Sequence, residues 1–236
     1  MMQERLQKIL SQAGVCSRRE AEKLILEKKV KVNGQIATLG TKASFEDEIL
    51  VNNKPITQRE ELVYFVLNKP KNTVCTLKDN FNRVKVTDLI DTDKKIFPVG
   101  RLDYDTTGVL LLTNDGKLSN LLTHPSSEIK RIYRARISAP LTDKEMEILS
   151  KPVIINNQRS TQEIYPADTK SYYVVLHQGS YHHVKKLFEL VDKKVLDLNR
   201  VEFANITVKN MQKGQYRRLT LHELKILKML VNYKEN

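Results

Sequence analysis

The chain has 236 residues, of which 40% are hydrophobic and 29% are charged, a composition typical of a folded globular protein rather than a collagen-like, low-complexity or disordered one. Its 40 lysine and arginine residues exceed its 28 aspartate and glutamate residues, which gives a formal net charge of +12. This excess favours a polyanionic partner such as nucleic acid over a neutral or acidic small molecule, with an anionic membrane surface as the alternative.

The N-terminal segment predicts two short helices. Ser17 and Glu20 have the spacing of a capping box, so the second helix is expected to begin at Ser17. Before it, Gly14 stands where a left-handed C-terminal cap belongs. The first helix is indicated by apolar residues that recur along one helix face, namely Leu6, Ile9, Leu10 and Ala13.

A β-hairpin is predicted after these helices. Val30 and Val32 alternate with lysines as far as Asn33-Gly34, a pair whose positive-φ preference suits a tight type I′ turn. The strand pattern ends near Ile56. Residues 1–58 are therefore expected to form a small α+β domain, close to the lower size at which a domain folds alone.

Basic residues are dense in this domain at positions that its core does not need. They favour a surface that follows RNA phosphates, although a merely solvated helix surface is the alternative. The segment ERLQKILSQAGVCSRREAEKLI, followed by VKVNGQ, resembles the RNA-binding domain named after ribosomal protein S4 over nearly all of the first 55 residues. The candidate RNA contacts in this domain are the basic residues Arg5, Lys8, Arg18, Arg19, Lys23 and Lys31, together with Ser17.

A second domain is expected over residues 59–236. Strand-like runs cover Val63–Leu67, Val109–Leu112, Ile132–Ile137, Tyr172–Leu176 and Val201–Val208. Helical spacing appears at residues 184–191, and Thr220 with Glu223 forms another capping-box pattern before the last apolar stripe. Strands and a few helices without regular βαβ alternation favour an α+β fold.

The segment PVGRLDYDTTG, residues 98–108, holds the densest group of functional residue types, in a loop before an apolar strand. Such residues also build turns, so their chemistry alone leaves catalysis and structure equally open. Together with the strand that follows, the segment resembles the signature of the pseudouridine synthases related to RsuA and RluB. The resemblance implies that Asp103 is the catalytic residue and that Arg101, Thr106 and Thr107 contact RNA. It also implies a mixed, mainly antiparallel sheet with flanking helices.

The same resemblance extends to KNTVCT after FVLNKP, to KRIYRA and to QGSYHHVKKLF. It implies that Tyr133 packs against the target uracil and that Lys185 forms an ion pair with Asp103, which keeps the carboxylate ionised and oriented. The third motif departs from the family pattern, since Gln178 replaces a common Glu and His183 replaces Gln. Because His can donate one hydrogen bond and accept another, His183 is still expected on the RNA-binding surface.

The resemblance predicts an enzyme that isomerises specific uridines of ribosomal RNA. The opening RLQKILSQAGVCSRRE looks closer to the large-subunit type, so 23S rRNA ranks first and 16S rRNA second. A non-catalytic ribosome-associated RNA-binding protein is a second hypothesis, against which the intact segment around Asp103 argues. A glycosidase using Asp103 and Asp105 is a third, but it leaves the positive charge and the N-terminal domain without a role.

No cofactor or metal is expected. Phosphate-binding and dinucleotide-binding glycine motifs are absent from the sequence, and the histidines at 177, 182 and 183 lack carboxylates at ligand spacing. Cys16 and Cys75, far apart, indicate neither a disulfide framework nor a zinc site. The sequence has no apolar run long enough to span a membrane and begins with charged residues, so we expect a cytoplasmic protein with no membrane partner, acting as a monomer.

Overall fold

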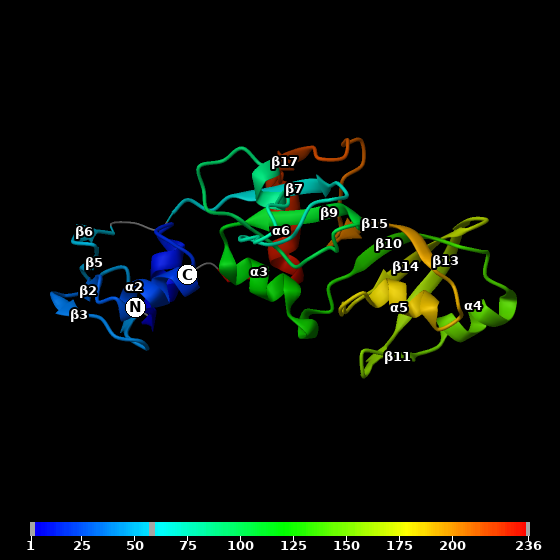
Figure 1. Ribbon diagram of the computed structural model, residues 1–236, viewed down its shortest axis with the longest axis horizontal. Coiled ribbons are helices and arrows are strands. Elements are labelled where there is room, and N and C mark those ends of the chain that lie inside the picture. The colour runs from blue at the N-terminus through cyan, green and yellow to red at the C-terminus, as the bar shows by residue number, and fades with distance from the viewer. Residues whose placement is uncertain (1–2, 57–59, 235–236) are drawn as a thin grey trace. The chain divides into compact units, whose positions relative to one another are not determined.

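The computed structural model describes residues 3–56 and 60–234, and it shows an α+β protein, as predicted (Figure 1). The chain divides into two compact units. One contains the chain up to Val63 together with Thr92–Lys95 and Asn114–Gly116, and the other contains the rest. The predicted domain boundary between residues 58 and 59 lies outside the described residues.

The N-terminal unit is built from two helices and two small sheets. Helix α1 spans Leu6–Gln12 and helix α2 spans Arg18–Leu26. As the capping pattern predicts, the Ser17 hydroxyl accepts a hydrogen bond from the Glu20 amide at 3.3 Å. The strands are β1 (Glu4–Arg5), β2 (Val30–Val32), β3 (Gln35–Ile36), β4 (Lys42–Ala43), β5 (Ile49–Val51) and β6 (Lys54–Pro55).

The predicted hairpin is present in this unit. Strands β2 and β3 pair antiparallel across Asn33 and Gly34, whose φ angles of 48° and 80° fit a type I′ turn. The four-stranded sheet has the order β3-β2-β5-β6, and β1 pairs separately with β4. Leu6, Ile9 and Leu10, three residues of the predicted helix face, are at most 1% exposed in the core of the unit.

The second unit is organised around one nine-stranded sheet. Its main path runs β13-β14-β10-β15-β9-β7-β17, with β16 paired to β15 and β8 paired to β9. The pairings are antiparallel except for β9 with β15, so the sheet is mixed and mainly antiparallel, as expected. The bounds are β7 Tyr64–Lys69, β8 Phe97–Pro98, β9 Thr107–Thr113, β10 Arg131–Ile137, β13 Gln162–Asp168, β14 Ser171–Leu176, β15 Val195–Phe203, β16 Ile206–Thr207 and β17 Tyr216–Arg218.

One predicted strand is wrong in its bounds. The run Val201–Val208 is broken by a turn at Ala204 and Asn205, which have φ angles of 51° and 64°, and continues as β16. Strand β15 instead begins six residues earlier, at Val195. Its first half contains Asp197 and Asn199, polar residues of low strand propensity, and pairing with β10 fixes its conformation.

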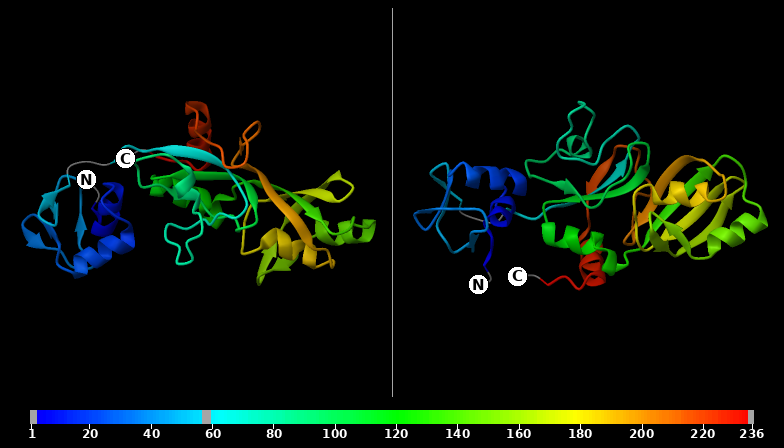
Figure 2. Two further views of the ribbon diagram at one scale, coloured as in Figure 1. Left: turned by 45° about the horizontal axis from the view of Figure 1, so that its top comes forward. Right: turned by 60° about the horizontal axis from the view of Figure 1, so that its bottom comes forward.

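Two groups of helices cover the sheet, and both have apolar cores (Figures 1 and 2). Helices α4 and α5 pack on β10, β13 and β14, whereas α3 and α6 pack on β7 and β9. The capping box predicted at Thr220 and Glu223 begins α6. The bounds are α3 Gly116–Thr123, α4 Asp143–Ser150, α5 His183–Glu189 and α6 Leu221–Leu230, with short 3-10 helices at Val86–Leu89 and Pro125–Ser127 and a hairpin of β11 (Val153–Ile155) and β12 (Gln158–Ser160).

Gly108 makes the parallel junction between β9 and β15 possible. Its φ angle is 107°, and a Cβ atom at this position would lie 2.1 Å from the main-chain oxygen of Arg200. Only glycine combines this backbone conformation with so close an approach of two strands. The junction fixes the C-terminal end of the loop that carries Asp103.

No helix among the described residues is long and apolar enough to cross a membrane.

Candidate active site

Asp103 lies in the loop between β8 and β9 and borders a cavity of about 440 Å³. Its side chain is 31% exposed, so a ligand can reach it. Tyr133 on β10 lines the same cavity, as does the loop Gly179–His182 before α5. Val74, Cys75 and Thr76 also line it, so the structure brings together residues from all four segments singled out in the sequence.

Lys185 on α5 lies between two carboxylates of the loop. Its Nζ is 3.5 Å from Asp103 Oδ2, and 2.8 and 2.9 Å from the two carboxylate oxygens of Asp105. The pair expected with Asp103 is thus shared, and Asp105 has the shorter contacts. Burial opposes ionisation of both Lys185 and Asp105, but their mutual hydrogen bonds and the charges around them together outweigh it, which raises the pKa of Lys185 and lowers that of Asp105.

His182 also faces Asp103, a feature that the sequence analysis did not predict. Its Nε2 lies 3.6 Å from Asp103 Oδ2, and its ring stacks on Tyr181 with a centroid separation of 3.8 Å. His182 has a left-handed backbone conformation, with φ of 54°, immediately before α5. This conformation is uncommon for a residue with a side chain, and here it accompanies a ring placed beside the carboxylate.

Lys69 anchors the Asp103 loop from within the protein. The residue is 0% exposed, and its Nζ donates to three main-chain oxygens, those of Pro70 at 3.1 Å, Asp103 at 3.0 Å and Thr106 at 2.9 Å. Burial, opposed mainly by the nearby Cys75 and the loop carboxylates, lowers its pKa to about 8. The sequence did not predict this role for Lys69, because no apolar periodicity in FVLNKP indicates that its lysine is buried.

Arg200 on β15 is another buried cation, and it lines the cavity beside Asp103. It is 2% exposed, its Nε donates to the Val109 carbonyl at 2.8 Å, and its guanidinium lies 4.8 Å from the centre of the Phe203 ring. Its Nη2 has no hydrogen-bond partner among the described residues. Arg200 was missed because β15 itself was placed too late in the sequence.

The other residues predicted to contact RNA in this unit occupy different environments. Arg101 is exposed and lines the cavity, whereas Thr106 is buried. Thr107 is directed elsewhere, since its hydroxyl lies 3.1 Å from Asn199 Oδ1 and lines a different cavity. His183 is half-buried, with Nε2 2.7 Å from the Ser160 hydroxyl and Nδ1 accepting from the Ser180 amide at 3.3 Å.

The RNA-contacting residues predicted in the N-terminal unit come from several elements. Arg5, Arg18 and Arg19 are exposed. Lys8 pairs with Glu4, and Lys23 lies 3.8 Å from Glu27. Of the two other predicted contacts, Ser17 caps the N-terminus of α2 and Lys31 is half-buried.

Metal ligands do not gather in the described part of the chain. No group of three or more His, Cys, Asp or Glu residues there has the arrangement of a metal site. Cys75 lies at the cavity, where its Sγ accepts from the Leu102 amide at 3.4 Å, and burial raises the pKa of its thiol.

Comparison with known proteins places the chain in a family. The family description RNA pseudouridylate synthase matches residues 63–222, and the S4 domain matches residues 4–49. The chain belongs to the RNA pseudouridylate synthase family. It is 38% identical to the ribosomal large subunit pseudouridine synthase B of Bacillus subtilis, over 99% of both chains. It is also 35% identical to an uncharacterised RNA pseudouridine synthase of Aquifex aeolicus, over 99% of this chain and 97% of the other.

A solved structure supports the same assignment. The crystal structure of a pseudouridylate synthase matches with a TM-score of 0.70 and 30% identity, over 94% of this chain and 99% of the other. The present chain, as a member of this family, is an isomerase. Its reaction breaks the bond between ribose and N1 of uracil, turns the base and rejoins it through C5, with no net redox change.

Proposed function

We propose that this enzyme isomerises one or a few uridines of ribosomal RNA, 23S rRNA first and 16S rRNA second, with Asp103 as the catalytic group. The observation that carries this proposal is the Asp103 carboxylate, which is accessible from the cavity, next to Tyr133, and 3.5 Å from Lys185. The name of the Bacillus subtilis relative supports a large-subunit substrate. The match to the S4 domain supports a structured RNA.

Asp103 is the carboxylate placed to act on an extruded uridine. It acts by adding to the reacting nucleoside or stabilising its charge, and by relaying the proton that leaves C5. Lys185 keeps this carboxylate oriented, and Asp105 holds Lys185 in turn. Tyr133 offers its ring to the uracil face, since it lies on the same cavity wall.

Extruding the uridine from its stack costs a few kcal/mol, which contacts elsewhere on the RNA must offset. The cavity beside Asp103, which we call the catalytic cavity, offers four arginines for such contacts: Arg83, Arg101, Arg131 and Arg200. In the N-terminal unit, Arg18 and Arg19 occupy the first turn of α2, where a cation is unfavourable for the helix itself. Their presence there favours a role in binding phosphates over a role in stability.

The proposal is tested by turnover in vitro. Unmodified 23S and 16S rRNA transcripts of the source organism, tritiated at uracil C5, are incubated separately with the full-length enzyme, and tritium release and the modified position are measured. We expect release from 23S rRNA at one or a few uridines, with the enzyme acting as a monomer. Release from 16S rRNA alone would transfer the assignment to the small subunit, and release from neither would refute an rRNA substrate. In the cell, the expected location is the cytoplasm, where the rRNA is made.

A further inference from the structure

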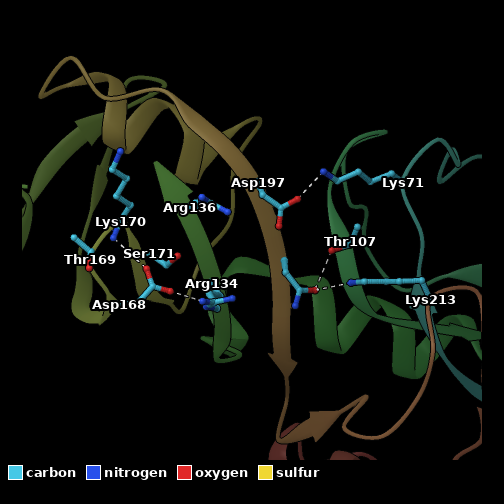
Figure 3. Close-up of a pocket in the computed structure, with 11 residues that line it drawn as sticks. Lys71, Thr107, Arg134, Arg136, Asp168, Thr169, Lys170, Ser171, Asp197 and Lys213 are labelled. Atoms are coloured by element: carbon cyan, nitrogen blue, oxygen red, sulfur yellow. Dashed lines mark hydrogen bonds and ion pairs between the residues drawn. The ribbon is translucent and has the colours of Figure 1, made fainter. Parts of the chain in front are cut away.

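A second cavity, about 870 Å³ and thus roughly twice the volume of the catalytic one, lies in the same unit (Figure 3). We call it the basic cleft. Its walls come from six parts of the chain that are distant in sequence, and every lining residue is polar or charged. These residues are Lys71, Thr107, Arg134, Arg136, Asp168, Thr169, Lys170, Ser171, Asp197, Asn199 and Lys213.

The basic cleft opens on the sheet face opposite to the catalytic cavity. Side chains alternate between the two faces along a strand. On β10, Tyr133 lines the catalytic cavity, whereas the next residue, Arg134, lines the basic cleft. On β15, Arg200 lines the catalytic cavity and Asn199 lines the basic cleft. A nucleotide bound beside Asp103 therefore does not occupy the basic cleft.

The charges of the basic cleft leave an uncompensated positive excess. Its five cations face two carboxylates, and each carboxylate already has a partner. Arg134 pairs with Asp168 at 2.5 Å, and Lys71 pairs with Asp197 at 2.6 Å (Figure 3). Three positive charges therefore remain to attract an anion.

Two of the remaining cations have no internal role. Arg136 and Lys170 are exposed, and their side chains make no hydrogen bond or ion pair with any described residue. Lys213 is different, since it reaches Asn199 Oδ1 at 3.4 Å. Burial, opposed by Asp197 and reinforced by the nearby positive charge of Lys71, lowers the pKa of Lys213. Folding stability does not explain why these three cations line one cleft.

We propose that the basic cleft binds the phosphodiester backbone of a second RNA segment, separate from the segment that presents the uridine to Asp103. This inference rests on the proposed function, because it assumes a large RNA substrate. The absence of any apolar residue among those described as lining the cleft favours a backbone over unstacked bases or a protein partner. Bases stack on aromatic rings, and protein interfaces are built around apolar anchors.

The test reverses the two unpartnered cations with Arg136→Glu/Lys170→Glu in the full-length enzyme. Its matched control, Lys144→Glu/Lys225→Glu, makes the same charge change at exposed positions of α4 and α6 that line neither cavity. Binding of each protein to an unmodified full-length 23S rRNA transcript is measured by filter binding between 50 and 400 mM salt. Single-turnover isomerisation is measured on a short hairpin that contains only the target uridine and its stem.

Losing two phosphate contacts should make the slope of log K against log salt shallower by about 1.4 to 1.8. Extrapolated from 1 M to 0.1 M salt, this corresponds to about 25- to 60-fold weaker binding of the long RNA. The rate on the short hairpin should stay within twofold of wild type. The milder variant Arg136→Ala/Lys170→Ala should show the same pattern to a smaller degree, with an unchanged melting temperature.

Two results would overturn the proposal. One is a salt slope and affinity equal to those of the control. The other is an equal loss on the long RNA and the short hairpin, which would mean that the substitutions disturb the catalytic side. If wild-type enzyme isomerises neither rRNA yet the salt slopes still separate, the rRNA assignment fails while the basic cleft stands as an RNA site.

Discussion

Replacing Lys69 by Met is the sharpest test of how the active-site loop is held. The substitution keeps a flexible chain of similar length but removes all three hydrogen bonds that Nζ donates, to the carbonyls of Pro70, Asp103 and Thr106. Two of those carbonyls belong to the loop that carries the proposed catalytic carboxylate. The loop then loses its hydrogen bonds to Lys69, the buried cation that holds it in place.

Lys69→Met should reduce both the stability and the rate, by amounts of similar size in free energy. A hydrogen bond from a charged donor contributes about 1.5–3 kcal/mol, but removing Lys69 also removes the cost of burying its charge. We therefore expect a loss of only about 1–3 kcal/mol in the free energy of unfolding. A displacement of a catalytic group by about 1 Å costs on the order of 100-fold in rate, so activity should fall by about that factor.

The pH dependence of stability should identify Lys69 separately. Its pKa is about 8 in the folded protein, below its ordinary value of 10.5. Between these values the unfolded chain holds a proton that the folded protein has released, so Lys69 makes stability rise with pH, and below pH 8 its contribution is constant. Relative to Lys69→Met, wild type should gain up to about 1.4 kcal/mol per pH unit in this window.

The assay combines single-turnover isomerisation at saturating enzyme with denaturant unfolding at several pH values. The control is Lys144→Met, which removes the same charge from an exposed position on α4 and should match wild type in both measurements. A Lys69→Met rate within threefold of wild type, in a folded protein, would refute the claim that Lys69 positions the loop.

Three further predictions concern the loop and the RNA contacts. Lys185→Met should lower the single-turnover rate at saturating enzyme about 100-fold, because two neighbouring carboxylates lose their shared cation. The control Lys186→Met should change this rate little, and equal losses in the two variants would refute the shared ion pair. Gly108→Ala should destabilise the folded protein by at least about 2 kcal/mol in denaturant unfolding, because the new methyl group meets the β15 backbone, and an unchanged midpoint would contradict this. Arg18→Glu/Arg19→Glu should weaken rRNA binding and flatten its salt dependence without lowering the melting temperature, because acidic residues are favourable in the first turn of a helix. An unchanged salt slope would mean that these residues only form solvated surface.

Local signals in the sequence were sufficient for much of the fold. Caps and turns are determined by near neighbours, so the helix start at Ser17, the turn at Asn33-Gly34 and the helix start at Thr220 were predicted correctly. The motif that contains Asp103 also lies within one short loop, which made it recognisable. Its role in catalysis stays a prediction, as do the roles of Tyr133 and Lys185.

Long-range pairings account for what the sequence did not indicate. Residues 69 and 103 meet only because β7 and β9 are neighbours in the sheet, and β9 meets β15 across more than ninety residues of chain. Strand β15 carries polar residues on the face of the basic cleft, so its first half lacked the apolar pattern of a strand. The sharing of Lys185 between Asp103 and Asp105 likewise depends on where α5 packs.

We propose that the enzyme uses Asp103 to isomerise uridine in ribosomal RNA. The decisive experiment is to map pseudouridines chemically in rRNA from cells that lack this gene and carry either the wild-type enzyme or Asp103→Asn. We expect one or a few 23S rRNA sites to regain pseudouridine with wild type and to stay unmodified with Asp103→Asn, although the variant is folded and binds rRNA. Full modification of those sites by Asp103→Asn would contradict it.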